Sequence, residues 1–307
     1  MIKKPNEIAI SIREIGRKKT MISLDRMFVL AVLAGAYIGF GAQLATTVSM
    51  DMAPRYGLGV TNMVSGAVFS VGLMLVILGG AELFTGNNLI WLSHLSGRAK
   101  LVQVIKNWVS VYLGNFVGSL LLVAIIFLGG LYGMGSNALG LRALAIANAK
   151  VNLGFIQLVA RGVVCNWLVC LAIWIATSAE DMTGKILACF FPITAFVASG
   201  FEHSVANMFF VPMGIMLRSV PSLVAQSNMN LGNLTWGNFM VRNLLPVTLG
   251  NLIGGGFFVA TLYWYVYLRP EARAVDMIAQ LNPEIGEEKG DKAKVRIARR
   301  TRELSES

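Results

Sequence analysis

The chain has few charged residues and few side chains of the kind that usually carry chemistry. Only 14% of its 307 residues are Asp, Glu, Lys or Arg, and its two histidines lie 109 positions apart. The three cysteines fall within apolar stretches, which indicates buried thiols rather than a disulfide framework or a metal site. No nucleotide-binding loop, metal-ligand cluster or catalytic triad is recognisable. We therefore expect no cofactor, no metal and no enzymatic activity.

Long apolar stretches take the place of these features. Hydrophobic residues make up 55% of the chain, and its mean hydropathy is +0.65, which excludes an ordinary soluble domain. A helix of about 20 apolar residues crosses a bilayer. The sequence therefore predicts an all-α membrane protein with a six-helix domain at residues 27–268, between an N-terminal segment at 1–26 and a tail at 269–307. The expected spans lie at residues 27–50, 61–94, 108–131, 155–179, 186–217 and 239–268.

Basic residues are distributed unevenly between the two sides of these spans. If both termini are cytoplasmic, 20 of the 26 Lys and Arg residues lie on the cytoplasmic side. The positive-inside rule therefore favours a plasma (inner) membrane protein with cytoplasmic termini. The first span is too long for the apolar core of a cleavable signal peptide. The net charge of +10 lies mostly beside the inner leaflet, so membrane lipid is the expected partner and nucleic acid is not.

Ionisable residues interrupt the second and fifth apolar stretches. Glu82 lies in the second, Glu202 and His203 lie in the fifth, and glycines precede both sites at Gly80 and Gly200. Ionisable groups are costly at membrane depth and usually face a cavity or a partner. A broken helix is tolerated there where its backbone lines a path enclosed by protein. The pattern predicts interruptions at residues 79–86 and 199–206 that help to form a substrate pathway.

The two halves of the chain resemble each other. Residues 106–118 align without gaps to residues 242–254, with six identical positions out of 13. The spacing Glu-x4-Asn also occurs twice, at residues 82–87 and 202–207. Each half contains three spans, an odd number, so the second half must be inverted in the membrane. Inverted repeats with matching interrupted helices place a binding path near the midplane.

Four motifs together resemble the formate–nitrite transporter family over residues 20–270. They are Gly80-Ala-Glu-Leu-Phe-Thr-Gly86, the Gly-Asn pairs of the third and sixth spans, Cys165-Asn-Trp-Leu-Val-Cys170, and Phe196-Val-Ala-Ser-Gly-Phe-Glu-His-Ser-Val-Ala-Asn207. The resemblance implies a homopentamer of aquaporin-like six-helix protomers, each with its own pore. It also implies transport of small monovalent anions or their acids, with formate first and nitrite, lactate or hydrosulfide as alternatives. Gly86-Asn87-Asn88 replaces a Ser-Thr pair familiar from formate channels, so the choice among these anions stays open.

The resemblance also assigns roles to individual residues. It implies that His203 is the central pore histidine, that Thr85 lies on a mobile loop in the second helix, and that Lys150 belongs to the outer vestibule. Asn166 and Asn207 are expected to line the pore. Apolar constrictions are expected from four further side chains, Phe69, Leu73, Leu83 and Phe196.

The chemistry of an anion pathway fits a histidine at this place. A bare anion cannot cross a layer of Phe and Leu side chains at reasonable cost, whereas its protonated acid can. His203 titrates near neutral pH, so it could donate a proton to the anion or stabilise it by a charge-assisted hydrogen bond. Neighbouring residues of a helix point about 100° apart, so Glu202 is expected to face away from the path that His203 lines. It is expected to hold backbone amides or a neighbouring helix, and Glu82 has the same expected role.

Two alternatives of other kinds remain at this point. The chain could be a non-transporting membrane sensor or enzyme subunit, although no motif supports that. It could also be a channel for neutral solutes, which would conduct without pH dependence. The glycines of the third and sixth spans (Gly114, Gly118, Gly250, Gly254, Gly255 and Gly256) are interpreted as close-packing positions rather than as a site.

Overall fold

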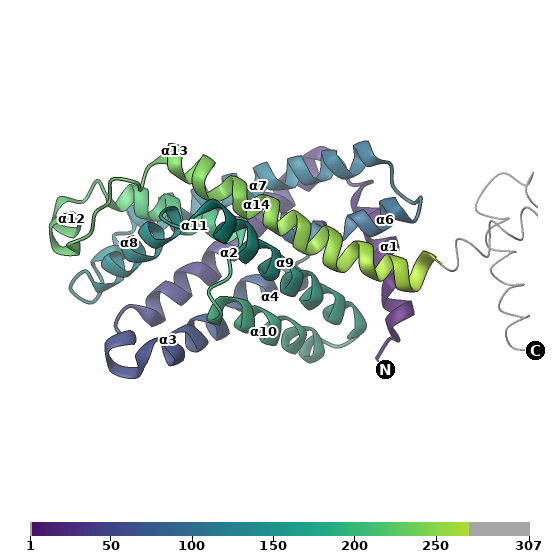
Figure 1. The fold of residues 1–307 in the computed structure, drawn as a ribbon, viewed down its shortest axis with the longest axis horizontal. Coiled ribbons are helices and arrows are strands. Elements are labelled where there is room, and N and C mark those ends of the chain that lie inside the picture. The colour runs from purple at the N-terminus through teal and green to yellow at the C-terminus, as the bar shows by residue number, and fades with distance from the viewer. Residues whose placement is uncertain (1, 270–307) are drawn as a thin grey trace, which may run out of the picture.

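The structure is a computed structural model that describes residues 2–269 of the chain. Within this range the regular elements are all helices, and most run roughly along the length of the molecule (Figure 1). The predicted tail at residues 269–307 lies, apart from its first residue, outside the described range. The helices in chain order are α1 (Pro5–Lys19), α2 (Leu24–Ser49), α3 (Ala53–Phe69), α4 (Val71–Gly79), α5 (Phe84–Asn87), α6 (Ile90–Leu95), α7 (Leu101–Leu128), η1 (Leu131–Gly133), α8 (Ala138–Val151), α9 (Phe155–Ser178), α10 (Met182–Ala198), α11 (Ser204–Leu217), α12 (Pro221–Ser227), α13 (Trp236–Asn238), η2 (Phe239–Leu244), α14 (Leu245–Leu252), η3 (Ile253–Thr261) and η4 (Trp264–Leu268).

Five helical segments are long and apolar enough to cross a membrane. They are α2, the pair α3 and α4, α7, α9, and the combined run Trp236–Leu268, and they correspond to five of the expected spans. The expected fifth span, residues 186–217, is divided between α10 and α11 by a break at residues 199–203. A sixth crossing is counted only if α11 and α12, which meet at an angle of 103°, form one bent span.

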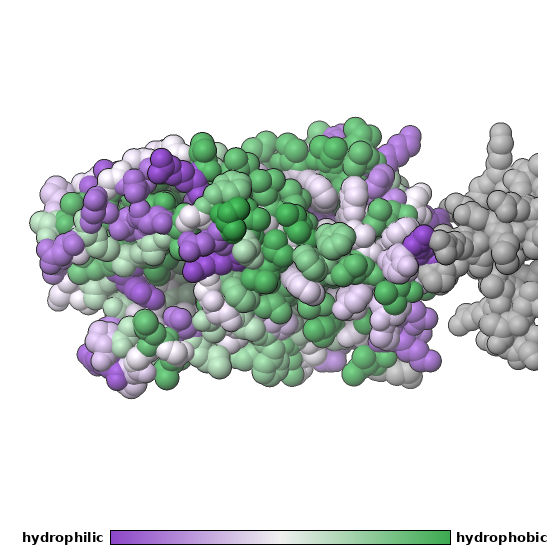
Figure 2. Space-filling view, in the orientation of Figure 1, coloured by the Kyte–Doolittle hydropathy of each residue, from purple (hydrophilic) through white to green (hydrophobic). Residues whose placement is uncertain are grey.

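The surface agrees with a membrane position. Apolar side chains cover the middle of the molecule, and hydrophilic side chains gather at the end that carries α8 and α12 and at the end near the N-terminus (Figure 2). Helix α7 exposes many apolar side chains, among them Val109, Leu113, Leu121 and Ile125. A soluble protein does not leave so large a continuous apolar surface in contact with water.

The two helix breaks have the same local cause. Gly80 ends α4 with φ +73°, and Gly200 follows α10 with φ +71°. Left-handed backbone is costly for residues with a Cβ, so glycine is the residue that ends both helices there. Residues 81–83 and 201–203 then run on without regular structure before α5 and α11 begin. The breaks are therefore shorter than predicted, because Thr85 and Ala206 already belong to the next helices.

Glycines bring neighbouring helices into close contact, as the sequence predicts. A Cβ on Gly118 would meet the backbone of Val32 in α2, and a Cβ on Gly254 would meet the backbone of Val163 in α9. Gly114 and Gly250 are equally crowded, and Gly255 faces Asn166. Gly256 differs from this expectation, because no atom lies within 4 Å of the position its Cβ would take.

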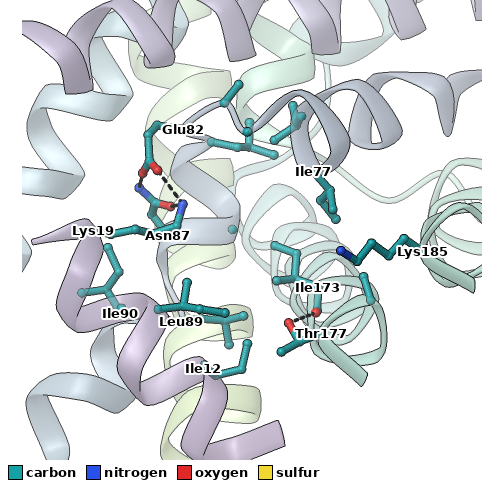
Figure 3. Close-up of a pocket in the computed structure, with 18 of the residues that line it drawn as sticks. Ile12, Lys19, Ile77, Glu82, Asn87, Leu89, Ile90, Ile173, Thr177 and Lys185 are labelled. Carbon is teal, nitrogen blue, oxygen red and sulfur yellow. Dashed lines mark hydrogen bonds and ion pairs between the residues drawn. The ribbon is translucent and has the colours of Figure 1, made fainter. Parts of the chain in front are cut away.

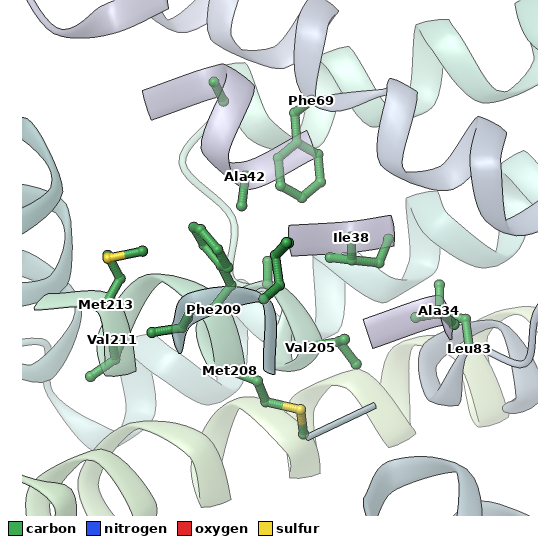
Figure 4. Close-up of a cluster of buried hydrophobic side chains, with 14 of the residues drawn as sticks. Ala34, Ile38, Ala42, Phe69, Leu83, Val205, Met208, Phe209, Val211 and Met213 are labelled. Atoms are coloured by element: carbon green, nitrogen blue, oxygen red, sulfur yellow. The ribbon is translucent and has the colours of Figure 1, made fainter. Parts of the chain in front are cut away.

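The N-terminal segment, for which no helix was predicted, forms α1. Ile8, Ala9 and Ile12 are buried on one face of this helix, against α6, α9 and η4. Their spacing places them on the same side of a helix, and this amphipathic pattern was the available signal. A second and larger apolar core surrounds α11, with Ala34, Ile38 and Ala42 of α2 facing its Val205 and Phe209 (Figure 4).

Candidate functional site

Two cavities approach each other from opposite ends of the molecule. The first, which we call the His203 cavity, has a volume of about 350 Å³ and lies beside α8. The second, which we call the α1 cavity, has a volume of about 540 Å³ and is bordered by α1, α4, α9 and α10 (Figure 3). His203 borders only the first cavity, and Leu83 borders only the second. The residues of the two helix breaks therefore border two different cavities, which share no lining residue.

A hydrogen bond joins the two breaks. Nε2 of His203 lies 3.0 Å from Oγ1 of Thr85, and both side chains are buried. Thr85 belongs to α5, directly after the first break, and His203 is the last residue of the second break and caps α11. The two residues singled out by the sequence, 118 positions apart, are thus in direct contact.

The surroundings of His203 determine which ring nitrogen carries the proton. The backbone N–H of Ala206 donates to Nδ1 at 3.0 Å, as expected for the residue that caps a helix. An N–H group can only donate, so Nδ1 holds a lone pair. In the neutral ring the proton is then on Nε2, which donates to Thr85. Protonation of Nδ1 would require the loss of the Ala206 hydrogen bond.

An apolar layer surrounds this hydrogen bond. The rings of Phe196 and His203 are stacked with centroids 5.9 Å apart, and Phe69 meets Phe196 edge to face at 5.7 Å. Leu73 and Leu83 belong to the same buried cluster, and all four predicted constriction residues are at most 3% exposed. Phe69 and Phe196 border the His203 cavity, and Leu83 borders the α1 cavity. These four buried side chains therefore form an apolar layer that includes residues bordering each cavity, and their role as a constriction stays a prediction.

A buried polar network holds the second break. The Lys150 ammonium lies 2.9 Å from both carboxylate oxygens of Glu202. The Asn207 amide donates to Glu202 at 2.7 Å and to the Oδ1 of Asn243 at 2.8 Å. Asn243 in turn donates to the backbone oxygen of Lys150 at 2.9 Å. Glu202 thus ties α8 and α11 together through side chains, whereas no backbone amide among residues 2–269 donates to its carboxylate.

The first break carries the same network with equivalent residues. The Lys19 ammonium lies 2.8 Å from Glu82, and the Asn87 amide donates to Glu82 at 2.7 Å and to Asn107 at 2.9 Å. The Asn107 amide reaches the backbone oxygen of Lys19 at 3.5 Å. Asn87 is part of the Gly-Asn-Asn departure noted in the sequence, and its amide supplies the bonds that Asn207 makes in the other half. Figure 3 shows Lys19, Glu82 and Asn87 side by side.

At each break, one asparagine side chain from a neighbouring helix forms hydrogen bonds with the backbone of the break. Asn115 accepts from the backbone N–H of Phe84 at 2.9 Å and donates to the backbone oxygen of Glu82 at 2.9 Å. Asn251 accepts from the backbone N–H of Ser204 at 2.9 Å and donates to the backbone oxygen of Glu202 at 3.0 Å. These are the paired asparagines of the internal repeat, so the repeat in sequence corresponds to a repeated structural function.

Asn166 and Asn207, predicted to line the pore, border neither cavity. Asn207 belongs to the Glu202 network, and the amide of Asn166 donates to the backbone oxygens of Thr85 at 3.2 Å and Asn251 at 2.7 Å. Their pore-lining role stays a prediction. The Oδ1 atoms of both residues are buried without a hydrogen-bond partner in the described chain. Unpaired buried oxygens of this kind are where a water molecule would bind.

Three cations and one carboxylate border the His203 cavity. Besides the Lys150–Glu202 pair, the cavity includes Arg142, which donates to Ser49 at 3.0 Å, and Arg161, which donates to the backbone oxygen of Gly200 at 3.4 Å. Neither guanidinium forms an ion pair within the described residues. Neither these two arginines nor Lys19 were predicted from the sequence as part of the site. Their contacts cross 39 to 93 positions of the chain, so no local signal revealed them.

Comparison with known proteins agrees with this geometry. The sequence profile of the formate/nitrite transporter family matches residues 6–265. A "Probable formate transporter" of Methanothermobacter thermautotrophicus is 44% identical, with 87% of this chain and 98% of that protein covered. The "Formate channel FocA" of Escherichia coli K12 is 41% identical, with 80% and 87% covered.

Solved structures of channels from the same family are also similar to this chain. A structure described as "Pentameric formate channel with formate bound" superposes with a TM-score of 0.74 at 41% identity, covering 80% of this chain and 98% of that one. One described as "FNT family ion channel" has a TM-score of 0.72 at 32% identity, with 84% and 98% covered. On the sequence match and the shared fold, this chain belongs to the formate/nitrite transporter family of membrane channels.

Proposed function

We propose that the protein carries formate across the membrane, along a path that runs from one cavity to the other past His203 and Thr85. The observation that carries this proposal is the Thr85–His203 hydrogen bond, which lies inside an apolar layer between two cation-bearing cavities. The family and the formate channels among its relatives supply the substrate class. A sensor or enzyme subunit has no comparable support.

Neutral His203 acts in this proposal as a hydrogen-bond donor. Its Nε2–H points at Thr85, and the Thr85 hydroxyl, which accepts that bond, has its own proton to donate. A formate ion that separates the two side chains would receive both donors in place of water. A full negative charge in the apolar layer remains costly, so the anion crosses the layer together with a proton. Since Nδ1 is occupied by Ala206, that proton comes from water in the cavities rather than from His203.

The fold is proposed to be two inverted three-helix repeats with six spans in an aquaporin-like arrangement. The matching networks around Glu82 and Glu202 support it, as do the glycines that end α4 and α10. The Tyr112 hydroxyl also lies 2.9 Å from Oγ1 of Thr248, and these residues occupy equivalent positions 136 apart in the repeat. Equivalent residues of two related halves meet only near the axis that relates the halves.

The assembly is proposed to be a homopentamer with one pore in each protomer and both termini in the cytoplasm. A solved relative is described as pentameric. The exposed apolar helices need covering by lipid or by neighbouring protomers. Native mass spectrometry in detergent tests the assembly, and a stable monomer or dimer would contradict it. Protease digestion of sealed vesicles tests the orientation.

A substrate comparison tests the proposed function. Purified protein in liposomes is given formate, nitrite, lactate or hydrosulfide from pH 5 to 8, and His203→Phe serves as the inactive control. We expect the highest permeability for formate and a strong reduction by His203→Phe with the assembly intact. Nitrite is the alternative substrate, since Asn87 and Asn88 depart from the pattern of formate channels. Equal conduction of all four without pH dependence would contradict the proposal.

A further inference from the structure

The α1 cavity contains a lysine that none of the networks above uses. Lys185 lies in the first turn of α10 and borders this cavity. In Figure 3 its side chain extends into the cavity, and its ammonium group lies between Ile77 and Ile173. Among residues 2–269, no carboxylate forms an ion pair with it and no group accepts a hydrogen bond from it. Its charge is therefore available to a mobile anion.

The other charges around the cavity leave Lys185 uncompensated. Lys19 and Glu82 are paired at 2.8 Å and cancel each other. Glu180 borders the cavity with an exposed side chain, whereas Asp181 lies outside its lining and accepts from the N–H of Gly184 at 2.7 Å, a bond that lowers the pKa of its carboxyl group and keeps it ionised. Lys3, the remaining side chain with a charge here, is a second cation. Among the side chains that border the cavity, three lysines thus face two glutamates, and the apolar walls concentrate the remaining positive charge on an entering anion.

The position of Lys185 in its helix also needs a reason. The N-terminal end of a helix is partly positive, so a cation in the first turn of α10 is unfavourable for helix stability. Lys185 gains no ion pair that would offset this cost. Besides its place in the cytoplasmic charge balance, the amine of this lysine lies in a cavity beside the constriction, where a ligand can offset the cost to the helix.

We propose that Lys185 is a positioning residue that captures small monocarboxylate anions in the α1 cavity before they reach Thr85 and His203. This inference rests on the proposed function, and it adds a binding station on the side opposite to Lys150. Under the proposed orientation the station faces the cytoplasm, and it therefore serves substrate that leaves the cell. The anion would be held by the ammonium group and by the water that the cavity admits.

The first test measures the formate concentration that gives half-maximal flux, separately from each side, in everted and right-side-out vesicles. In a passive pore the permeability at low concentration is equal in both directions, so the half-saturating concentration is the informative quantity. Lys185→Gln should raise it roughly three- to tenfold on the α1 side and leave the other side unchanged. Lys185→Arg should stay close to the parent. Lys106→Gln, a loss of one exposed charge on the same side but outside the cavity, is the matched control.

Chemical rescue separates capture from a structural role. Lys185→Cys is treated with 2-aminoethyl methanethiosulfonate, which restores a cation, or with the 2-sulfonatoethyl reagent, which adds an anion. The native cysteines Cys165, Cys170 and Cys189 are buried, and the treated parent controls for them. We expect the cation to restore half-saturation and the anion to raise it further.

The measurements distinguish failure of the proposed function from failure of the capture role of Lys185. If the parent carries no formate, the proposed function fails, and this inference fails with it. If the parent conducts and Lys185→Gln behaves like Lys106→Gln, only the capture role is wrong. Equal effects of the two reagents, or an equal rise on both sides, would show that Lys185 acts through the structure and would overturn the inference.

Discussion

The ammonium group of Lys150 lies 2.9 Å from both carboxylate oxygens of Glu202, in a pair whose side chains are only 14% and 5% exposed. The family resemblance implies that Lys150 belongs to the outer vestibule, where an unpaired cation would attract anions. The structure gives it a different environment, because its charge is compensated where it faces the His203 cavity. We therefore expect Lys150 to contribute little to long-range attraction and much to the stability of the second break.

Removal of either member of this pair should destabilise the channel. Lys150→Gln leaves Glu202 buried without its cation, at a cost of about 3–5 kcal/mol. We expect a lower thermal unfolding temperature and reduced flux at every salt concentration, since a buried pair is poorly screened. The double variant Lys150→Gln with Glu202→Gln should recover part of the stability. Thermal unfolding in detergent measures both, and a Lys150→Gln defect that disappeared at high salt would restore the attraction model.

The arginines of the His203 cavity should supply the attraction instead. Arg161 is partly exposed and donates only to a backbone oxygen within the described chain, so its charge acts on ions in the cavity. We expect Arg161→Gln to lower formate permeability a few-fold at low salt. The reduction should vanish when salt shortens the screening length to about 3 Å near 1 M. Arg142→Gln should show the same salt dependence. Liposome flux at several ionic strengths measures it, and a reduction independent of salt would contradict steering.

His203 should act through its hydrogen bonds rather than through titration. His203→Asn retains an acceptor for the Ala206 N–H, and His203→Gln retains a donor directed toward Thr85, while neither titrates in the physiological range. We expect reduced flux in both variants, with the pH profile of the parent preserved from pH 5 to 8. Thr85→Ser should conduct well. Thr85→Val lacks the hydroxyl, and its formate flux should be roughly ten-fold or more below that of the parent. This is the loss expected for a hydrogen bond to a charged group, which is worth about 1.5–3 kcal/mol.

The pH profile decides between two mechanisms. If His203→Asn flattens it, then His203 itself donates the proton, and its Nδ1 must exchange the Ala206 hydrogen bond for a proton during transport. Assembly is checked by size-exclusion chromatography so that a folding defect is not mistaken for lost conduction.

Much of the scaffold was predictable because the membrane imposes a simple pattern. Apolar length located five of the six expected spans, and Gly80 and Gly200 marked the breaks because only glycine readily adopts their backbone angles. The positions of Thr85 and His203 followed from the family resemblance. The charge partners could not be read in the same way. Lys19 reaches Glu82 over 63 positions and Lys150 reaches Glu202 over 52, and such contacts depend on packing between elements rather than on local pattern.

The paired glycines of the repeat allow a last prediction about packing. A Cβ on Gly254 would collide with the backbone of Val163, which cannot move aside as a side chain can. We expect Gly254→Ala to destabilise the protein by about 1–3 kcal/mol, as overpacking does. Gly256→Ala, two positions later in the same helix, meets no atom within 4 Å and is the control. It should match or exceed the stability of the parent, because alanine favours a helix. Thermal unfolding of the two variants gives the comparison, and equal destabilisation would mean that general helix flexibility, not close packing against α9, is what these glycines provide.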